Sequence, residues 1–455
     1  MPPISRFKLV AAVGVLIAIL GIGIALLMHD SHEIAGALPA VPASPVEEDS
    51  AAQIVPAGEW RAHGRTAYGQ RYSPLTDITP ANVAGLKEVW RYRSGGGENA
   101  QLLKAGWRIY LCASNQSVIA LHPTNGIQLW RRDIAAQRVT CPGVAFQPPF
   151  SEPVIAGGEC GSKIFMPTAD GRLLVMDTET GQPCPKFGGK GEIDLWAGMP
   201  RRRPDAPSPV VLTKKLAIAR GAGVVRAWDI DTGAPLWAWD SGADSPISGA
   251  VASFDETLGM VYVPMSKSLV ALDLASGKLR WTIPAPATAQ PALVDLPAVP
   301  ALVQPTARGE LLVLDRRTGK PMKHLIKVID KGGLAVDPQR GVAFVAASGA
   351  TSTAYVAGVD LASGKVAWKH RAAAGGEPMI TAGGVAFLCA AQDSTVRAFD
   401  ITTGRQLWES LLPASGQGTP ITYTGDQDRQ FVAVTAGDYV IAYALPKQGG
   451  ASPTP

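Results

Sequence analysis

Charged residues are scarce in this sequence. Only 18% of its 455 residues are Asp, Glu, Lys or Arg, and the formal net charge is +4. The basic residues are scattered, apart from the triplet Arg201–Arg203 beside Pro204. We interpret this triplet as a solvated loop rather than as a site for anionic lipid or sugar. Without a basic stripe that follows a phosphate backbone, the composition argues against a nucleic-acid-binding protein.

Cysteine and histidine are too few and too dispersed for a metal centre. The five cysteines form no CxxC pair and the six histidines lie far apart, so the spacing argues against a zinc site. An odd number of cysteines leaves at least one thiol unpaired in an oxidising compartment. Cys141 and Cys160 are candidates for closing a loop, but the sequence alone does not determine the pairing.

One long apolar run extends from Leu9 to Met28 without a charge. Its 20 residues, at about 1.5 Å per residue, match the roughly 30 Å hydrocarbon core of a bilayer. Arg6 and Lys8 precede the run and acidic residues follow it, so the positive-inside rule places residues 1–8 in the cytoplasm and the rest of the chain outside. We interpret the run as a single-pass signal-anchor in the inner membrane. A cleaved signal peptide, with Ala35–Ala37 as the cleavage site, is the competing interpretation.

Glycine is abundant, with 49 residues, and much of it belongs to a repeated motif. The motif is an apolar residue, then Asp-x-x-(Thr/Ser/Asn)-Gly, then Trp four residues after the Gly. The Asp side chain accepts backbone hydrogen bonds and the Gly adopts positive φ, so the motif predicts a hairpin between two strands. We expect each Trp to pack sideways against the neighbouring unit. Five copies are nearly complete and two lack the Trp: His122–Trp130, Asp229–Trp237, Asp273–Trp281, Asp360–Trp368 and Asp400–Trp408, then Asp177–Gly181 and Asp315–Gly319.

The turn glycines recur every 40 to 55 residues, a spacing that suits one four-stranded propeller blade for each turn. An apolar strand at Tyr439–Leu445 lacks a following Trp strand, whereas Leu86–Tyr92 carries Trp90 without a preceding turn. Pairing these two strands completes an eighth blade and leaves no free sheet edge. The sequence therefore predicts an all-β, eight-bladed β-propeller over residues 57–446.

The regions outside the predicted propeller are simpler. Residues 9–28 form the predicted transmembrane helix. Residues 29–56 are rich in Ala and Pro without apolar periodicity, which is typical of a tether. Residues 447–455 are expected to be a disordered tail.

Several segments resemble one enzyme family. The run Tyr68–Leu75 (YGQRYSPL), followed by ITPANV and LKEVW, resembles the N-terminal signature of dehydrogenases that depend on pyrroloquinoline quinone (PQQ). Further segments are similar to the membrane-bound glucose and quinate dehydrogenase branch: Tyr110–Gln116, Val139–Val144, Val313–Lys320, Leu412–Tyr423 and Asp438–Pro446. The likeness covers about residues 57–446.

The resemblance implies a specific chemistry. Enzymes of that branch hold PQQ with a calcium ion in the central channel, oxidise a sugar or polyol hydroxyl, and pass electrons to ubiquinone. A carboxylate base takes the hydroxyl proton while the calcium ion polarises a quinone carbonyl. Cationic side chains hold the carboxylates of the cofactor.

This chain departs from the family pattern where that chemistry belongs. The catalytic aspartate is expected between Trp281 and the Ala-Gln-Pro landmark at Ala289–Pro291, but no carboxylate lies there. Asp295 follows the landmark and corresponds to a different aspartate. An expected Asn is replaced by Ile247, and the loop after Met265 is short, so calcium loses oxygen ligands. We assign no catalytic residue and no metal ligand, and we regard retention of PQQ and calcium as doubtful.

Two arginines are the candidate cofactor-binding residues. Arg138 stands where the family branch has a His, and Arg308 lies next to Ala307, which replaces a Lys. Either guanidinium can pair with a cofactor carboxylate. The alternative is that both are solvated arginines at a blade edge.

Two functions from different classes remain as hypotheses. The first is a periplasmic quinoprotein-like dehydrogenase that acts on a sugar or polyol and reduces ubiquinone. The second is a non-catalytic propeller that binds a periplasmic protein partner, comparable to outer-membrane assembly scaffolds built from the same repeat.

The anchor hypothesis is tested by cell fractionation. The full-length chain is expected to remain with the inner membrane after osmotic shock, because an uncleaved helix of this length spans the bilayer. Release of a shortened, soluble form into the periplasm would show that residues 9–28 are a cleaved signal peptide.

Overall fold

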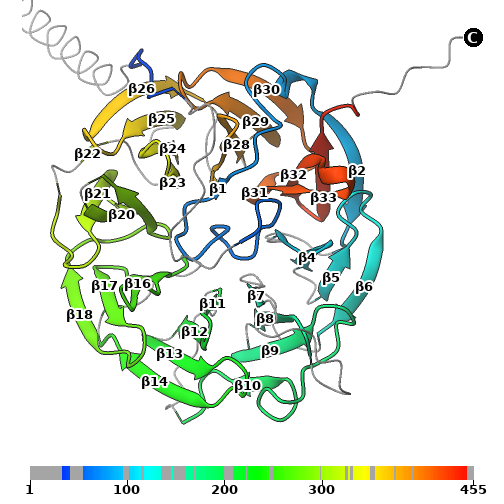
Figure 1. Ribbon diagram of the computed structural model, residues 1–455, viewed down its shortest axis with the longest axis vertical. Coiled ribbons are helices and arrows are strands. Elements are labelled where there is room, and N and C mark those ends of the chain that lie inside the picture. The colour runs from blue at the N-terminus through cyan, green and yellow to red at the C-terminus, as the bar shows by residue number, and fades with distance from the viewer. Residues whose placement is uncertain are drawn as a thin grey trace, which may run out of the picture.

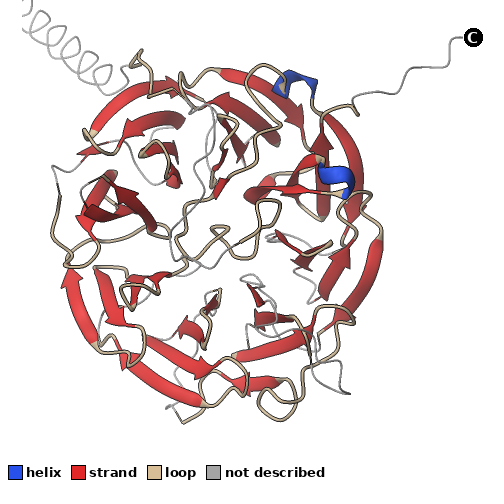
Figure 2. Cartoon of the chain, viewed as in Figure 1, coloured by secondary structure: helices blue, strands red, loops and turns tan. Residues whose placement is uncertain are grey.

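Antiparallel sheets surround a central axis in the computed structural model (Figure 1). Nearly all regular structure in the described part of the chain is strand, with two short 3-10 helices at Val83–Gly85 (η1) and Asp426–Asp428 (η2) (Figure 2). The structure describes residues 33–40, 55–95, 102–113, 117–134, 145–147, 160–168, 170–198, 209–221, 223–242, 244, 250–297, 299–322, 326–327, 332–348, 354–372, 376–390 and 393–447.

The sheets are the eight predicted blades, and we number them I to VIII along the chain. In each blade the strands follow one another from the central axis to the rim. Blades I to IV are β3 (Leu102–Ala105), β4 (Arg108–Ala113), β5 (Ser117–Leu121) and β6 (Gln128–Asp133); β7 (Ala145–Gln147), β8 (Lys163–Pro167), β9 (Arg172–Asp177) and β10 (Glu192–Asp194); β11 (Val211–Leu212), β12 (Leu216–Gly221), β13 (Val224–Asp229) and β14 (Pro235–Asp240); and β15 (Ser253–Asp255), β16 (Met260–Pro264), β17 (Leu269–Asp273) and β18 (Leu279–Ile283).

Blades V to VIII continue the ring. They are β19 (Ala292–Leu296), β20 (Val299–Pro305), β21 (Glu310–Asp315) and β22 (Ile326–Lys327); β23 (Gly332–Asp337), β24 (Val342–Ser348), β25 (Ala354–Asp360) and β26 (Lys365–Arg371); β27 (Met379–Thr381), β28 (Val385–Ala390), β29 (Thr395–Asp400) and β30 (Gln406–Leu411); and β31 (Gly416–Thr424), β32 (Gln430–Ala436), β33 (Tyr439–Ala444) and β2 (Lys87–Arg93). The strand β1 (Tyr72–Ser73) adds to blade VII in parallel with β27.

Blade VIII closes the ring as the sequence predicts. Its outer strand β2 comes from the N-terminal part of the chain and pairs antiparallel with β33, so that Trp90 lies opposite Ala442 and Arg93 opposite Tyr439. The closure is a confirmed prediction. The strands that pair here come from the N-terminal and C-terminal parts of the propeller sequence, so their backbone hydrogen bonds form only when the ring is folded.

The repeated motif forms the hairpin between the third and fourth strands. In the six turns that begin with Asp, the carboxylate accepts a backbone N–H at 2.8 to 2.9 Å. In all seven turns the glycine has φ between 67° and 74°, the left-handed region that favours glycine. The turn therefore has the conformation that the motif predicts.

Five rim tryptophans dock on the turn of the following blade, whereas Trp408 packs edge-on against Tyr443 of blade VIII, which has no such turn. A Cβ atom on Gly404 would lie 2.5 Å from Trp368, and one on Gly277 would lie 2.5 Å from Trp237. The indole N–H of Trp368 also donates to the carbonyl of Ile401, at 3.2 Å. Trp90, Trp130, Trp237 and Trp281 make the same pair of contacts with blades I, II, IV and V. The predicted sideways packing is thus confirmed for these tryptophans: the indole ring covers the turn glycine of the next blade, and the indole N–H donates to a carbonyl of the same turn.

Blades II and V lack the tryptophan, and smaller apolar side chains replace it. The Gly233 turn of blade III meets Ile193 and Phe187 of blade II, and the Gly364 turn of blade VI lies near Ile326 of blade V. The ring therefore keeps an apolar contact at these two blade junctions without the indole hydrogen bond.

A segment before β1 runs across the middle of the ring, and we call residues 55–73 the central segment (blue in Figure 1). It hydrogen-bonds in chain order to the inner strands of blades VIII, I, II, IV, V, VI and VII. The bonded carbonyls of the segment belong to Gly58, Trp60, Arg61, Ala67, Tyr68, Gln70 and Arg71. Since inner strands otherwise present unpaired N–H groups at a sheet edge, the central segment satisfies those edges one after another.

Part of the predicted tether lies against the propeller. Ile34 exchanges two backbone hydrogen bonds with Lys369 of β26, at 3.0 and 2.9 Å, and the N–H of Leu38 donates to Thr402. Leu38 is 3% exposed. Within residues 33–40 the chain is therefore attached to blades VI and VII, and residues 41–54 lie outside the described part. No helix among the described residues is long and apolar enough to cross a membrane, and the predicted Leu9–Met28 helix falls outside them.

The cysteine pairing differs from the candidate loop between Cys141 and Cys160. Cys160 instead forms a disulfide with Cys184, with their Cα atoms 5.7 Å apart. The blade II turn reverses the chain after β9, and the N–H of Cys184 donates to Val175, so that the two cysteines meet. Cys112 is also disulfide-bonded. Cys389 is free and buried, as the odd number of cysteines predicts.

The docked indole contact predicts a large loss of stability when it is removed. Trp368 is fully buried, so Trp368→Ala is expected to lower the free energy of unfolding by about 3–5 kcal/mol. Trp107→Ala is the matched control, because Trp107 is 53% exposed and the expected loss is about 1 kcal/mol or less. Guanidinium unfolding of both variants measures the difference, and equal losses would contradict the docking argument.

Candidate functional site

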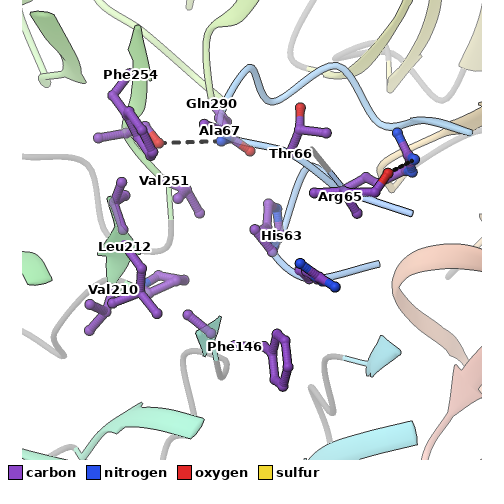
Figure 3. Close-up of a pocket in the computed structure, with 17 residues that line it drawn as sticks. His63, Arg65, Thr66, Ala67, Phe146, Val210, Leu212, Val251, Phe254 and Gln290 are labelled. Carbon is purple, nitrogen blue, oxygen red and sulfur yellow. Dashed lines mark hydrogen bonds between the residues drawn. The ribbon is translucent and has the colours of Figure 1, made fainter. Parts of the chain in front are cut away.

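A cavity lies between the central segment and blades II to IV (Figure 3). Its walls are mainly apolar side chains of these blades, with Val210, Leu212 and Phe254 among them, and the central segment contributes His63 and Thr66. The Phe254 N–H donates to Ala67, at 3.2 Å, and holds the segment beside the wall. The cavity measures about 30 Å³.

Gln290 of the Ala-Gln-Pro landmark lines this cavity. Its side-chain amide donates to Ala252 and Ser253, at 3.3 and 3.2 Å, while its Oε1 has no hydrogen-bond partner among the described residues. A Cβ on Gly69 would lie 2.8 Å from the amide of Gln290. The glycine therefore allows the central segment to pass directly over the glutamine.

A second polar group lies where the central segment meets blades VII and VIII. Glu377 is in the connection that leads to β27, and its Oε1 is 2.6 Å from Nη2 of Arg71. Its Oε2 is 2.8 Å from Nε2 of His63 and accepts the hydroxyl of Thr419 at 2.6 Å. Nε2 of His63 also lies 2.9 Å from Nη2 of Arg71, so whether this nitrogen donates to Glu377 or accepts from Arg71 depends on the tautomer of the imidazole. We call Glu377, Arg71, His63 and Thr419 the Glu377 cluster.

The cluster keeps the Glu377 carboxylate ionised. Burial raises its pKa, but the charges of Arg71 and His63 and the hydrogen bonds from His63 and Thr419 outweigh burial and hold the pKa well below the usual value. The Arg71 side chain is fully buried and also donates to the carbonyl of Leu334, at 3.1 Å. A carboxylate stabilised in this way is a weak proton acceptor, since an effective general base has a pKa near the working pH.

The acids of the described part that are more deeply buried than Glu377 are paired as well. Glu59, Asp255 and Asp337 are at most 9% exposed, and they pair with Arg61, Arg316 and Arg340, at 2.5, 2.7 and 2.8 Å. Arg316 also pairs with Asp295, at 2.8 Å, so Asp295 has a structural contact between strands. The described residues thus offer no unpaired buried carboxylate.

Comparison with known proteins identifies the family. A family model for PQQ proteins, described as glucose/ethanol/alcohol dehydrogenase, beta-propeller domain, matches residues 60–269, 265–329 and 335–432. The chain belongs to this family.

Its relatives are quinoproteins. The chain is 28% identical over 695 positions to quinoprotein glucose dehydrogenase of Gluconobacter oxydans, covering 97% of this chain and 85% of the relative. It is 25% identical to quinate/shikimate dehydrogenase (quinone) of Acinetobacter baylyi, covering 92% and 82%. Quinohemoprotein alcohol dehydrogenase ADHIIG of Pseudomonas putida shares the fold, with a TM-score of 0.71 at 18% identity over 92% of this chain and 85% of that one.

This quinoprotein is much shorter than its relatives along the aligned region. The first alignment runs over 695 positions, at least 240 more than the 455 residues of this chain. Because the repeated turns and the four strands of each blade are present, the missing positions do not come from the blade framework. After Met265, the turn between β16 and β17 is tied to the connection that follows β14, because Asp244 accepts the Ser266 and Ser268 hydroxyls at 2.8 and 2.6 Å.

The two predicted cofactor-binding residues have different outcomes. Arg308 lies on the exposed turn between β20 and β21, where its N–H donates to Thr306 at 3.3 Å, and it does not line the cavity. Arg138 and Ile247 lie outside the described residues. The role of Arg138 and Arg308 in cofactor binding therefore stays a prediction.

The described residues alone do not make up a site for PQQ and its calcium ion. The cavity between the central segment and blades II to IV has room for about two water molecules. The cations of the central segment are already engaged: Arg61 by Glu59, Arg71 by Glu377, and Arg65 by the carbonyls of Val55 and Glu59. No group of three or more His, Cys, Asp or Glu side chains in the described ranges is arranged to hold a metal ion.

Sequence reasoning does not find the Glu377 cluster. Arg71 belongs to the YGQRYSPL signature, and His63 is one of the dispersed histidines, but Glu377 follows Arg71 by 306 residues. Only the path of the central segment through the ring brings them together. The Ala-Gln-Pro landmark is the one signal in the sequence that marks the cavity.

The Glu377 cluster predicts a pH-dependent contribution to stability. A carboxylate with a depressed pKa stabilises the fold above its unfolded-state pKa of about 4.3, and this contribution is lost as the pH falls through the folded-state pKa. Glu377→Gln leaves the buried Arg71 unpaired, which is expected to cost about 3–5 kcal/mol at pH 7. The difference from the parent protein should shrink as the pH falls below about 4.

Thermal unfolding of the parent and of Glu377→Gln between about pH 3 and pH 7 measures this effect. Glu88→Gln is the control, because Glu88 forms an exposed pair with Arg91 and such a pair contributes about 0–1 kcal/mol. A constant difference across the pH range would contradict the assignment of the charged state to Glu377.

Proposed function

We propose that this protein is a membrane-anchored periplasmic propeller of the quinoprotein family that binds a partner without catalysing PQQ-dependent oxidation. The observation that carries the proposal is that every buried carboxylate among the described residues is held by an arginine. A dehydrogenase of this family needs a carboxylate that accepts the proton of the substrate hydroxyl. The lack of a carboxylate between Trp281 and Ala289 supports the same conclusion.

Retained dehydrogenase activity is the competing function, and family membership favours it. In that case the substrate is a sugar or polyol, the cofactors are PQQ and calcium, and the electron acceptor is ubiquinone in the inner membrane. Arg138 and Arg308 are then the residues that we expect to contact the cofactor carboxylates. Loss of the base lowers the rate about 10²- to 10⁴-fold but does not by itself prevent PQQ from binding. A protein that binds PQQ without turnover is therefore an intermediate case between a dehydrogenase and a non-catalytic propeller.

Titration of the purified full chain with PQQ and Ca²⁺ distinguishes these functions. We expect no saturable change in cofactor absorbance, because the arginines of the central segment are already engaged by Glu59, Glu377 and backbone carbonyls. Quinoprotein glucose dehydrogenase of Gluconobacter oxydans is the positive control. Saturable binding that Arg308→Ala weakens supports the intermediate case. PQQ-dependent sugar oxidation in membranes that disappears on deletion of this chain overturns the proposal.

A further inference from the structure

A cleft of about 260 Å³ lies at the rim of the ring, between blades I and II, and we call it the rim cleft. Its described lining comes from the end of β6 in blade I, from β9 in blade II and from the connection that leads to β10 (Figure 1). Pockets that hold small molecules measure about 300–1,000 Å³, so the rim cleft is close to the lower end of that range. It shares no lining residue with the cavity beside the central segment.

The wall of the rim cleft in blade II is a loop that replaces the first part of an outer strand. In blade I the outer strand begins directly after its turn glycine, whereas β10 begins only at Glu192. Residues 183–191 occupy the interval and are tied to β9. The N–H of Cys184 donates to the carbonyl of Val175, at 2.9 Å, and the N–H of Val175 donates to Gly191, at 2.8 Å. Since the disulfide of Cys184 holds the same loop, this wall is formed before a ligand arrives.

The floor of the rim cleft is apolar. Trp130 of β6 docks on the blade II turn, and side chains two and four residues further along a strand point to the same side, so Arg132 and Ile134 also face blade II. Ile134 packs against the core cluster that contains Leu174 and Met176 of β9. A molecule in the rim cleft therefore contacts apolar side chains of both blades.

Two cations at the rim cleft have no carboxylate partner among the described residues. Arg132 donates to Oε1 of Gln182, at 3.1 Å, and forms no ion pair with a residue that the structure describes. Lys190 is exposed in the loop that forms the wall, and the same holds for its ammonium group. Both side chains are thus able to donate hydrogen bonds to an anion.

The described acids that line the rim cleft or lie beside it each accept a hydrogen bond or an ion pair from a neighbour. They are Glu192 and Asp170 with Arg172, Asp133 with Ser117 and Arg131, and Asp194 with the backbone N–H of Trp196. With these acids present the net charge around the cleft is small, so recognition depends on direct contact with Arg132 and Lys190 rather than on a long-range field. A single negative charge suits this balance better than a dianion, which would also be repelled by the Glu192 carboxylate.

We propose that the rim cleft binds a small carboxylic acid with an apolar body. Arg132 and Lys190 donate charge-assisted hydrogen bonds to the carboxylate, and a guanidinium has the fork geometry that such pairing favours. The apolar body lies against Ile134 and the floor of Leu174 and Met176, where the contact removes apolar surface from water. A free acid and the C-terminal residue of a peptide share this chemistry. The site lies at the rim, so it goes beyond the proposed function and does not depend on whether the propeller binds PQQ.

NMR of the full chain, labelled with ¹³C-methyl methionine in a non-ionic detergent, tests the site. The reporter is the methyl group of Met176, which Met176→Leu assigns, and Met265, buried in blade IV, is the internal control. Benzoate represents a free acid and acetyl-leucine a C-terminal residue, and benzamide and acetyl-leucinamide are the matched uncharged compounds. We expect at least one carboxylate, but neither amide, to shift the Met176 resonance saturably while Met265 stays unchanged. The carboxylate that does so identifies the source of the ligand.

The two cations are tested by Arg132→Gln combined with Lys190→Gln. Loss of both charge-assisted contacts should weaken binding at least about tenfold. Lys190→Gln alone changes only an exposed side chain, keeps the fold intact and should weaken binding about threefold. The matched control is Lys215→Gln combined with Arg405→Gln, which removes two exposed charges at blades III and VII and should leave binding unchanged. The proposal is overturned if no carboxylate shifts Met176, if an amide shifts it as strongly as its acid, or if both Lys190 variants bind like the parent protein.

Discussion

The contact between a rim tryptophan and a turn glycine is the interaction on which the ring depends. The indole of one blade covers the glycine of the next blade and donates a hydrogen bond to the same turn, as Trp368 does to Gly404 and Ile401. A side chain on that glycine would collide with the indole, so both residues are required together. A single blade has no partner for its tryptophan, and this makes the blades mutually dependent. Closure by Trp90 extends the same contact to blade I.

A closed ring creates a further requirement at its centre. The inner strands converge there with open edges, and the central segment pairs with seven of them in chain order. In crossing the ring, the segment brings several arginines into buried positions. Each of these needs a carboxylate or carbonyl partner, because an isolated buried charge is costly. The acids near the axis are used for this purpose, with Glu377 and Arg71 as the clearest pair.

The chain belongs to the quinoprotein family, but its described buried carboxylates are paired with arginines and are therefore poor proton acceptors. The family model covers the propeller almost completely, and the blades depend on turn and rim residues that this chain keeps. Catalysis depends on a few side chains in connections, and the stretch between Trp281 and Ala289 contains no Asp or Glu. A scaffold and a site of this type can therefore change independently.

The sequence by itself determined the blade repeat, the eighth blade and the sideways use of tryptophan. These features are local: a turn motif acts within five residues, and its spacing counts the blades. The resemblance also led to the family and to the missing carboxylate before Ala289. Only the tertiary structure decided the Cys160–Cys184 pairing, the route of the central segment and the Glu377 cluster. Each of these features joins residues that are far apart in the sequence or that do not belong to the repeated motif. Their distances in space are set only when the ring closes.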